Sequence, residues 1–333
     1  MTKVLVTGAT GFIGANLVKH LVEQGDDVRI LVRHNSVHSF IDGLHVEKIV
    51  GDLNDLGQLR VACSGCQQVF HLAARISFNQ KDYEETYNVN VMGTRHLLHA
   101  AFDAGVEKFI HASSGATIGM PSSSTAFINE ETPFPDELKK PSYAYSKWLA
   151  EQEVLSVQQQ GLNVSIANIS TVYGAGDKTL NAGSLIAAIS KFPVFIAPPG
   201  GCSVIGVNDV VSGLIAIANN GRKGERYILT GENRTFLSIF DTIAQVVKNQ
   251  RVERILPDFS VFFAKNSARI IERVSSLFGV PSKLLTEDVV RNLFYFRYLD
   301  NTKAKIELDW QPQIDFRAAV KEAFEFYETH RLL

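Results

Sequence analysis

The sequence of 333 residues has only three cysteines, no long apolar run and no excess of positive charge. Three cysteines cannot build the disulfide framework of a small secreted domain. Lys and Arg number 33 against 35 for Asp and Glu, so the net charge of −2 lacks the basic excess typical of nucleic-acid-binding proteins. The sequence therefore indicates an ordinary globular protein, long enough for about two domains.

The N-terminal segment does not resemble a targeting signal. Its apolar stretch, Val4 to Val6, is three residues long and runs directly into a glycine-rich turn. No apolar run approaches the roughly 18 residues that a transmembrane helix needs. We therefore expect a cytoplasmic protein without a membrane span.

Cys63 and Cys66 form a C-x-x-C pair, the spacing of some zinc and redox sites. A zinc site needs about four ligands, and no second cysteine pair follows, since Cys202 lies far along the chain. We interpret the pair as two small residues in a turn before a strand and expect no metal.

Short apolar segments alternate with amphipathic ones through the first half of the chain. Ile13, Leu17 and Leu21 recur at four-residue spacing, which predicts a helix over 12–23. Strands that alternate with helices indicate an α/β fold with a doubly wound parallel sheet. The predicted strands are 4–6, 28–32, 46–50, 68–72, 108–111, 163–168 and 226–229, and further helices are predicted over 87–104 and from about 143 onward.

The second half is less regular. Residues 192–201 are rich in Pro and Gly and predict an extended loop, and Asp209 is expected to cap a helix over 210–218. Residues 235–297 combine amphipathic helical patterns with many phenylalanines, which either line an apolar substrate pocket or belong to the core. These phenylalanines include Phe259, Phe262, Phe263 and Phe278.

Gly8, Gly11 and Gly14 lie between the first predicted strand and the first predicted helix. In this position one glycine permits a tight turn, one lets the backbone approach a pyrophosphate, and one lets helix and strand pack closely. The helix N-terminus then presents N–H groups and a partial positive charge to the phosphates. The turn predicts a dinucleotide-binding site.

The end of the second predicted strand indicates which dinucleotide is bound. An NAD-preferring site often has Asp or Glu there, whereas this chain has Val32 followed by Arg33. A guanidinium can pair with a 2′-phosphate that a carboxylate would repel. We therefore predict NADP(H) as the cofactor, and Asp52, after the third strand, as a partner of the adenine amine.

Tyr143 and Lys147 are four residues apart at a predicted helix start and share one face. A nearby ammonium stabilises a phenolate, so we expect a lowered Tyr143 pKa suited to proton exchange with a carbonyl oxygen. Ser114, at the end of an apolar strand, can hydrogen-bond the same oxygen. Tyr145 is a rival tyrosine, but position 149 is Leu rather than Lys.

With these residues in place, the chain resembles an extended short-chain dehydrogenase/reductase over residues 2–232 and more loosely beyond. The matching features are the glycine spacing, His71-Leu72-Ala73-Ala74, Asn90, and the set Ser114, Tyr143 and Lys147. The resemblance implies that Tyr143 exchanges the proton, that Lys147 also holds the nicotinamide ribose, and that Ser114 orients the substrate oxygen. The cofactor contacts we expect are Thr7, Gly8, Thr10, Gly11, Phe12, Ile13, Gly14, Arg33, Asp52, Leu53, Leu72, Ala73, Ala74, Asn90, Lys147 and Ser170.

The resemblance is to the branch of dihydroflavonol 4-reductases and 3β-hydroxysteroid dehydrogenases, and its main competitor is the nucleotide-sugar epimerase and dehydratase branch. The competitor often carries an Arg-Asp pair that contacts a diphosphate, and Cys202-Ser203 stands in its place here. An Arg-Pro that often follows the sixth strand is replaced by Asn168-Ile169, so Ser170 and Thr171 are expected to supply polar contacts instead.

These observations favour an NADPH-dependent reductase of a ketone or aldehyde. The alternatives are a nucleotide-sugar epimerase or dehydratase with tightly bound NAD, and a non-enzymatic dinucleotide sensor or scaffold. We expect a Rossmann domain over 1–175, joined by 206–232, and a smaller, mostly helical substrate-binding region over 176–205 and 233–333. The family resemblance also implies a homodimer formed through helices near 84–104 and 143–160.

Overall fold

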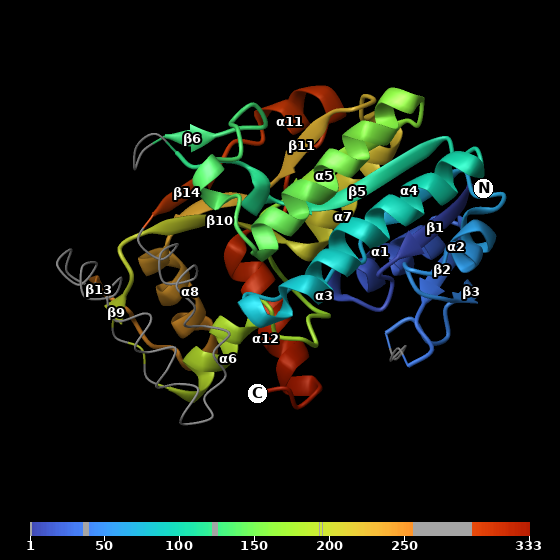
Figure 1. Cartoon of the computed structure of the whole chain (residues 1–333). Helices are drawn as coiled ribbons and strands as arrows, with labels where there is room; N and C mark the ends of the chain where they lie inside the picture. The colour runs from blue at the N-terminus through green and yellow to red at the C-terminus, as the bar shows by residue number, and fades with distance from the viewer. Residues whose placement is uncertain (1, 36–39, 122–125, 193, 195, 256–294) are drawn as a thin grey trace.

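The structure, a computed structural model, describes residues 2–35, 40–121, 126–192, 194, 196–255 and 295–333 (Figure 1). Its centre is a seven-stranded sheet in which every neighbouring pair is parallel. The strands lie in the order β3-β2-β1-β4-β5-β7-β11. Strands β2 and β3 follow β1 on one side, and the later strands are added on its other side, so the strand order reverses between β1 and β4. Their bounds are β1 Lys3–Thr7, β2 Asp27–Val32, β3 Glu47–Val50, β4 Gln68–His71, β5 Lys108–Ser114, β7 Val164–Ile169 and β11 Arg226–Leu229.

Helices cover both faces of this sheet (Figure 1). One face carries α1 (Phe12–Glu23), α7 (Val207–Asn220) and α11 (Thr302–Leu308). The other carries α2 (Leu56–Cys63), α4 (Gly93–Asp103) and α5 (Tyr143–Gln160). This confirms the doubly wound α/β prediction, and the inner strands are buried on both faces, as parallel strands require.

The predicted helix over 87–104 is built from three pieces. A short helix α3 (Tyr83–Tyr87) leads into a π-helical turn (Asn88–Met92), which continues into α4. Such wide turns often occur at functional sites, and this one holds Asn90.

A second, smaller sheet lies beside the first, with the order β12-β10-β14-β6 and with β8 also paired to β10. Its strands are β6 Phe127–Ile128, β8 Thr171–Tyr173, β10 Gly201–Gly206, β12 Glu232–Thr235 and β14 Phe296–Leu299. Three helices, α6 (Gly183–Lys191), α8 (Phe236–Lys248) and α12 (Phe316–Thr329), share an apolar core with β8 and β10. Residues 192–201, predicted as a loop, contain the short strand β9 (Ile196–Ala197), which pairs with β13 (Arg254–Ile255).

Asp209 does not cap α7, contrary to the sequence prediction. The helix begins at Val207 with Gly206 as its N-cap, because β10 runs directly into it. The Asp209 side chain is buried and accepts hydrogen bonds from the backbone N–H groups of Gln313 and Ile314, at 2.9 and 3.0 Å. It therefore ties the segment before α12 to the helices of the first sheet.

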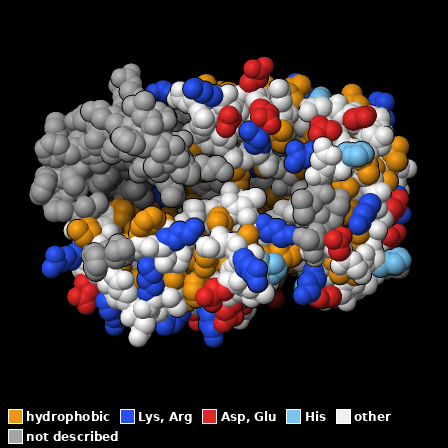
Figure 2. All heavy atoms as spheres, turned by 90° about the horizontal axis from the view of Figure 1, so that it is seen from below, with side chains coloured by type: hydrophobic (Ala, Val, Ile, Leu, Met, Phe, Trp, Pro, Cys, Tyr) orange, Lys and Arg blue, Asp and Glu red, His pale blue; other side chains and the backbone are white. Residues whose placement is uncertain are grey.

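Basic and acidic side chains are interspersed on the face shown in Figure 2. Among the described residues, no helix is long and apolar enough to cross a membrane. The phenylalanines at 259, 262, 263 and 278 lie outside the described residues.

Candidate active site

The glycine turn after β1 lies where the strand order reverses, between β1 and β4. Gly8 has φ +72°, and a Cβ there would lie 2.6 Å from the backbone nitrogen of Ala73. A Cβ on Gly14 would lie 2.1 Å from the carbonyl oxygen of Gly8. Close backbone contacts therefore require glycine at both positions, as expected of a turn that receives a pyrophosphate.

The start of α1 is suited to an anion. Gly11 is its N-cap, with extended backbone and no side chain to accept from the first-turn N–H groups. No acidic residue lies in that first turn. These N–H groups and the helix dipole therefore remain available to phosphate oxygens. The cradle fits a dinucleotide, with Thr10, Phe12 and Ile13 around the helix start and Leu72, Ala73 and Ala74 directly after β4.

Arg33 directly follows β2 and is exposed. It makes no hydrogen bond or ion pair with any other described residue. Asp52 holds the turn after β3, where its Oδ1 accepts from the backbone nitrogen and the Nδ2 of Asn54, both at 3.0 Å. The next residue, Leu53, is buried and packs closely on Gly93.

A chain of hydrogen bonds links β1, β4 and α4 beneath the cradle. The Thr7 hydroxyl lies 2.7 Å from Nδ1 of His71, and Nε2 of His71 lies 2.8 Å from the Thr94 hydroxyl. Thr94 donates its own proton to the carbonyl of Asn90 at 2.6 Å, so it accepts from His71 Nε2. Burial lowers the pKa of His71 to about 3, so the ring is neutral and its Nδ1 accepts from Thr7. The Thr7 side chain therefore serves the fold.

Ser114, Tyr143 and Lys147 come together at the carboxyl end of β5. Tyr143 is the first residue of α5, after the N-cap Ser142, and the Ser114 side chain interacts with its hydroxyl so as to lower the pKa of the phenol. Lys147, one turn later, is buried, and its Nζ donates to the carbonyl of Ala112 at 2.6 Å. The three side chains named from the sequence thus share one site at the sheet edge that also carries the glycine turn.

The protonation states suit proton donation by Tyr143. Desolvation raises the pKa of Tyr143 to about 12, against a lowering by the Ser114 side chain. Burial lowers the pKa of Lys147 to about 8, while the Glu151 carboxylate acts to raise it. The expected lowering of the Tyr143 pKa by Lys147 is absent, because desolvation dominates and the Lys147 ammonium points to a backbone carbonyl. Near neutral pH, Tyr143 is a phenol and Lys147 is charged.

Asn90 supports the start of α5. Its Oδ1 accepts from the backbone nitrogen of Arg75 at 2.8 Å, and its Nδ2 donates to the Arg75 carbonyl and the Ser146 hydroxyl, both at 3.0 Å. Ser146 donates in turn to the carbonyl of Tyr143 at 2.7 Å. The Asn90 amide is therefore used within the protein, to hold the loop after β4 against the helix that carries Tyr143.

Tyr145 lies apart from this site. Its ring stacks with those of Phe134 and Trp148, at centroid separations of 6.4 and 5.9 Å. Ser170 has a buried hydroxyl with no hydrogen-bond partner among the described residues, consistent with its expected role as a polar contact.

Cys202 and Ser203 lie in β10 and offer no positive charge to a diphosphate. Burial raises the pKa of the Cys202 thiol to about 12, and the Ser203 hydroxyl bonds the Asn233 side chain. Arg297 is the β14 neighbour of Cys202, but its guanidinium reaches the carbonyls of residues 115, 116 and 118.

Cys63 and Cys66 are both buried, one at the end of α2 and one shortly after it. Burial raises the pKa of Cys63 to about 12, which disfavours the thiolate that metal binding and redox chemistry need. Within the described ranges, no group of three or more His, Cys, Asp or Glu side chains is placed to hold a metal ion.

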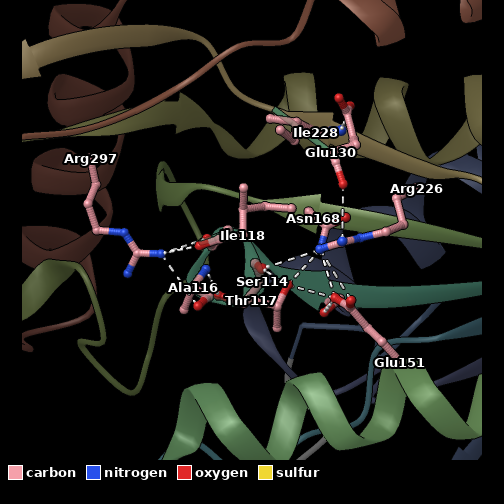
Figure 3. A network of polar contacts seen from close by, with 12 residues as sticks. Ser114, Ala116, Thr117, Ile118, Glu130, Glu151, Asn168, Arg226, Ile228 and Arg297 are labelled. Atoms are coloured by element: carbon pink, nitrogen blue, oxygen red, sulfur yellow. Dashed lines mark hydrogen bonds and ion pairs between the residues drawn. The ribbon is translucent and has the colours of Figure 1, made fainter. Parts of the chain in front are cut away.

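A largely buried polar network behind Ser114 is not predicted by the sequence. Its members are Thr117, Glu151, Asn168, Arg226 and Arg297 (Figure 3). The only local signal is that Glu151 follows Lys147 by four residues and so shares its helix face. A carboxylate at this spacing is equally common on solvated helix surfaces, so its burial cannot be read from the sequence.

Comparisons with known proteins identify the family of this chain. Residues 4–229 match the model of the NAD dependent epimerase/dehydratase family. The chain is 35% identical to a putative dihydroflavonol 4-reductase of Synechocystis sp., covering 98% of this chain and 94% of that protein. It is 27% identical to a 3 beta-hydroxysteroid dehydrogenase/Delta 5-->4-isomerase of Mycobacterium tuberculosis, covering 98% and 90%.

A solved structure, that of gox2253, superposes with a TM-score of 0.86 at 32% identity over the full length of both chains. The fold and the resemblance to an extended short-chain dehydrogenase/reductase are therefore confirmed. The chain belongs to the NAD-dependent epimerase/dehydratase family and is an NAD(P)-dependent oxidoreductase of the extended short-chain dehydrogenase/reductase type.

Proposed function

We propose that the protein is an NADP(H)-dependent reductase of a ketone or aldehyde. The observation that carries this proposal is the protonated Tyr143 hydroxyl beside Ser114 at the carboxyl end of β5, with Lys147 one helical turn away. A neutral phenol at this position is a proton donor, which is what reduction of a carbonyl requires.

Each residue of the site has a separate role in this reaction. The nicotinamide supplies a hydride to the carbonyl carbon when the cofactor is bound. Tyr143 donates its proton to the carbonyl oxygen, and the Ser114 hydroxyl hydrogen-bonds the same oxygen as negative charge develops on it. Once its ammonium turns from the Ala112 carbonyl toward Tyr143, Lys147 stabilises the phenolate that remains there. The product is an alcohol, and Tyr143 regains its proton from solvent.

Arg33 supports NADP(H) over NAD(H). It directly follows β2 at the edge of the cradle, it is exposed, and no described carboxylate neutralises it. A 2′-phosphate placed there would gain a charge-assisted contact. The acidic residue that would favour the ribose 2′-OH is replaced by Val32.

Phe78 supports an apolar or aromatic substrate of small to medium size. Its side chain is 46% exposed, and its ring meets that of Tyr143 edge-on at a centroid separation of 6.1 Å. It lines a small depression together with Asn79, Ser142 and Tyr143. An exposed ring next to the proton donor is a surface on which an apolar substrate can pack. The relatives named above, a dihydroflavonol reductase and a hydroxysteroid dehydrogenase, fit this expectation.

A panel of carbonyl compounds tests the proposal. Purified protein is mixed with NADPH or NADH and with ketones and aldehydes that range from small aliphatic to bicyclic aromatic compounds. We expect carbonyl-dependent oxidation of NADPH, faster than that of NADH, with aromatic substrates preferred. Release of bound NAD(H) on denaturation, without net cofactor oxidation in the panel, would instead favour the nucleotide-sugar epimerase or dehydratase alternative.

Three further features belong to this proposal. We propose a cytoplasmic protein, a homodimer that uses α4 and α5, and a substrate-binding region formed by 176–205 and 233–333. The return of β11 to the first sheet beside β7 supports assigning 206–232 to the cofactor-binding part. Light scattering of the purified protein tests the dimer.

A further inference from the structure

The direction of the Ser114 side chain depends on the short 3-10 turn that follows it, Gly115–Thr117. The Ser114 hydroxyl oxygen accepts from the backbone nitrogen of Ala116 at 3.1 Å, and the Ile118 N–H donates to the Gly115 carbonyl at 3.2 Å. These bonds are local. Contacts with residues outside the turn must therefore fix its position relative to Tyr143.

One anchor is Glu151, on the same face of α5 as Tyr143 and Lys147. Its carboxylate is buried, and its Oε1 accepts from the Thr117 hydroxyl and from Nδ2 of Asn168, both at 2.7 Å. The Ser113 hydroxyl also bonds this oxygen. Glu151 thus contacts the residue before Ser114 and the residue three after it (Figure 3).

The Glu151 carboxylate is paired with a cation from another strand. Nη2 of Arg226, in β11, lies 3.4 Å from the second carboxylate oxygen of Glu151. Arg226 is itself held by a bond from its Nη1 to the carbonyl of Glu130 at 3.2 Å. A buried charge is tolerated when it is paired and hydrogen-bonded, and Arg226 provides this pairing for Glu151.

The second anchor is Arg297, in β14 of the smaller sheet. Its Nη2 donates to the carbonyl of Ile118 at 2.7 Å and lies 3.2 and 3.4 Å from those of Gly115 and Ala116. Figure 3 shows Arg297 and Glu151 approaching the turn from opposite sides. The turn is therefore held between the helix that carries Tyr143 and a strand of the second sheet.

We propose that Glu151 and Arg297 are positioning residues that keep the Ser114 hydroxyl on the substrate oxygen during reduction. Neither contacts the Ser114 hydroxyl itself; both act through the turn 115–118. The inference rests on the proposed reductase function. A shift of the Ser114 hydroxyl by a fraction of its hydrogen-bond length would weaken its contact with the developing charge, without altering the glycine cradle.

The first experiment compares Glu151→Gln and Arg297→Met with Glu153→Gln. Glu153 lies on the same helix and pairs with Arg95 at 2.7 Å, but makes no contact with the turn. We expect kcat to fall about tenfold or more in the first two variants, with the KM for NADPH within about twofold of wild type. Glu153→Gln should leave both unchanged. Arg297→Lys, which keeps a donor, should recover part of the activity.

A milder variant tests the proposal even if Glu151→Gln or Arg297→Met fails to fold. Thr117→Val removes only the hydroxyl that lies 2.7 Å from Glu151 and 2.8 Å from the carbonyl of Ser114. We expect it to lower kcat in the same way at unchanged KM for NADPH. A wild-type kcat in all three variants of the network would overturn the proposal.

The second experiment repeats Glu151→Gln in a Ser114→Ala background. If Glu151 acts through Ser114, the second substitution should cost almost nothing further in kcat, because the group it positions is gone. Fully additive losses would mean that Glu151 supports the fold or acts through Lys147, whose pKa its charge acts to raise, and either would contradict the proposal.

Amide hydrogen exchange of the peptide that contains residues 113–119 gives a readout independent of turnover. Exchange should be faster in Glu151→Gln and Arg297→Met than in wild type and Glu153→Gln, and unchanged exchange would overturn the proposal. If wild-type protein reduced no carbonyl compound, the proposed function would fail, and exchange alone would still decide whether the two residues order the turn.

Discussion

The two halves of the seven-stranded sheet build their functional groups in different ways. At the end of β1 the site is made of backbone: three glycines allow close contact, and α1 begins without a side-chain cap. At the ends of β5 and β7 the site is made of buried polar side chains, each with several partners. The half at β1 is suited to bind a ligand through backbone groups that glycine leaves accessible. The half at β5 and β7 positions its functional side chains through hydrogen bonds.

This difference predicts unequal tolerance to mutation. A backbone cradle fails when a single methyl group is added, because no rotamer relieves the contact. A side-chain network fails in steps, since each bond removed leaves others in place. Substitutions in each half therefore test this difference.

The largest effect on cofactor binding is expected from Gly14→Ala. Its Cβ would meet the carbonyl oxygen of Gly8 at 2.1 Å, so either the turn or α1 must move. We expect NADPH affinity, measured by fluorescence titration, to fall more than about 100-fold, equivalent to roughly 3 kcal/mol.

Gly25→Ala, just beyond the end of α1, is the matched control. Gly25 has φ +84°, and a Cβ added there would meet nothing within 4 Å, so the substitution should cost about 1–2 kcal/mol of stability with no change in affinity. Equal losses of affinity in the two variants would mean that the contrast between cradle and network is wrong.

A smaller effect is expected from Arg33→Asp, because Arg33 is the positively charged side chain that we propose meets the 2′-phosphate. Loss of a charge-assisted bond worth about 1.5–3 kcal/mol should raise the KM for NADPH roughly 10- to 100-fold and leave the KM for NADH nearly unchanged. Arg60→Asp, on the exposed side of α2, is the control for a change in net charge. Equal changes for both cofactors would remove the argument for NADP(H).

The smallest effect is the pH dependence set by Lys147. A lysine is charged below its pKa, and burial lowers this pKa from 10.5 to about 8. Reduction needs the ammonium, so kcat/KM should be level below pH 8 and fall about tenfold per pH unit above it. A profile that stays level up to a pH near 10 would show that Lys147 retains an ordinary pKa or does not assist Tyr143.

The same contrast explains how much could be predicted from the sequence. The glycine turn lies between a strand and a helix that the hydrophobic pattern predicts. Tyr143 and Lys147 share a face because they are four residues apart in one predicted helix. Ser114 lies at the end of an apolar strand, and parallel pairing places it beside α5. The position of Asp209 in its helix was predicted wrongly, because its partners lie more than 100 residues away, at Gln313 and Ile314.

Long-range polar contacts could not be predicted. Arg297 reaches residues about 180 positions earlier, and Glu151 pairs with a strand 75 residues later. His71 was matched only as part of a family segment, whereas its ring links β1 to α4 through Thr7 and Thr94. The pKa of Tyr143 likewise follows from desolvation in the folded site, which no residue spacing reveals.

The central claim is that Tyr143 donates the proton in NADPH-dependent carbonyl reduction, and kcat of Tyr143→Phe beside Tyr145→Phe tests it most directly. Both substitutions remove one hydroxyl from the first turn of α5, but only Tyr143 contacts Ser114. We predict a fall of about 10²–10⁴-fold in kcat for Tyr143→Phe at unchanged NADPH affinity, and wild-type turnover for Tyr145→Phe. Full turnover in Tyr143→Phe would contradict the account.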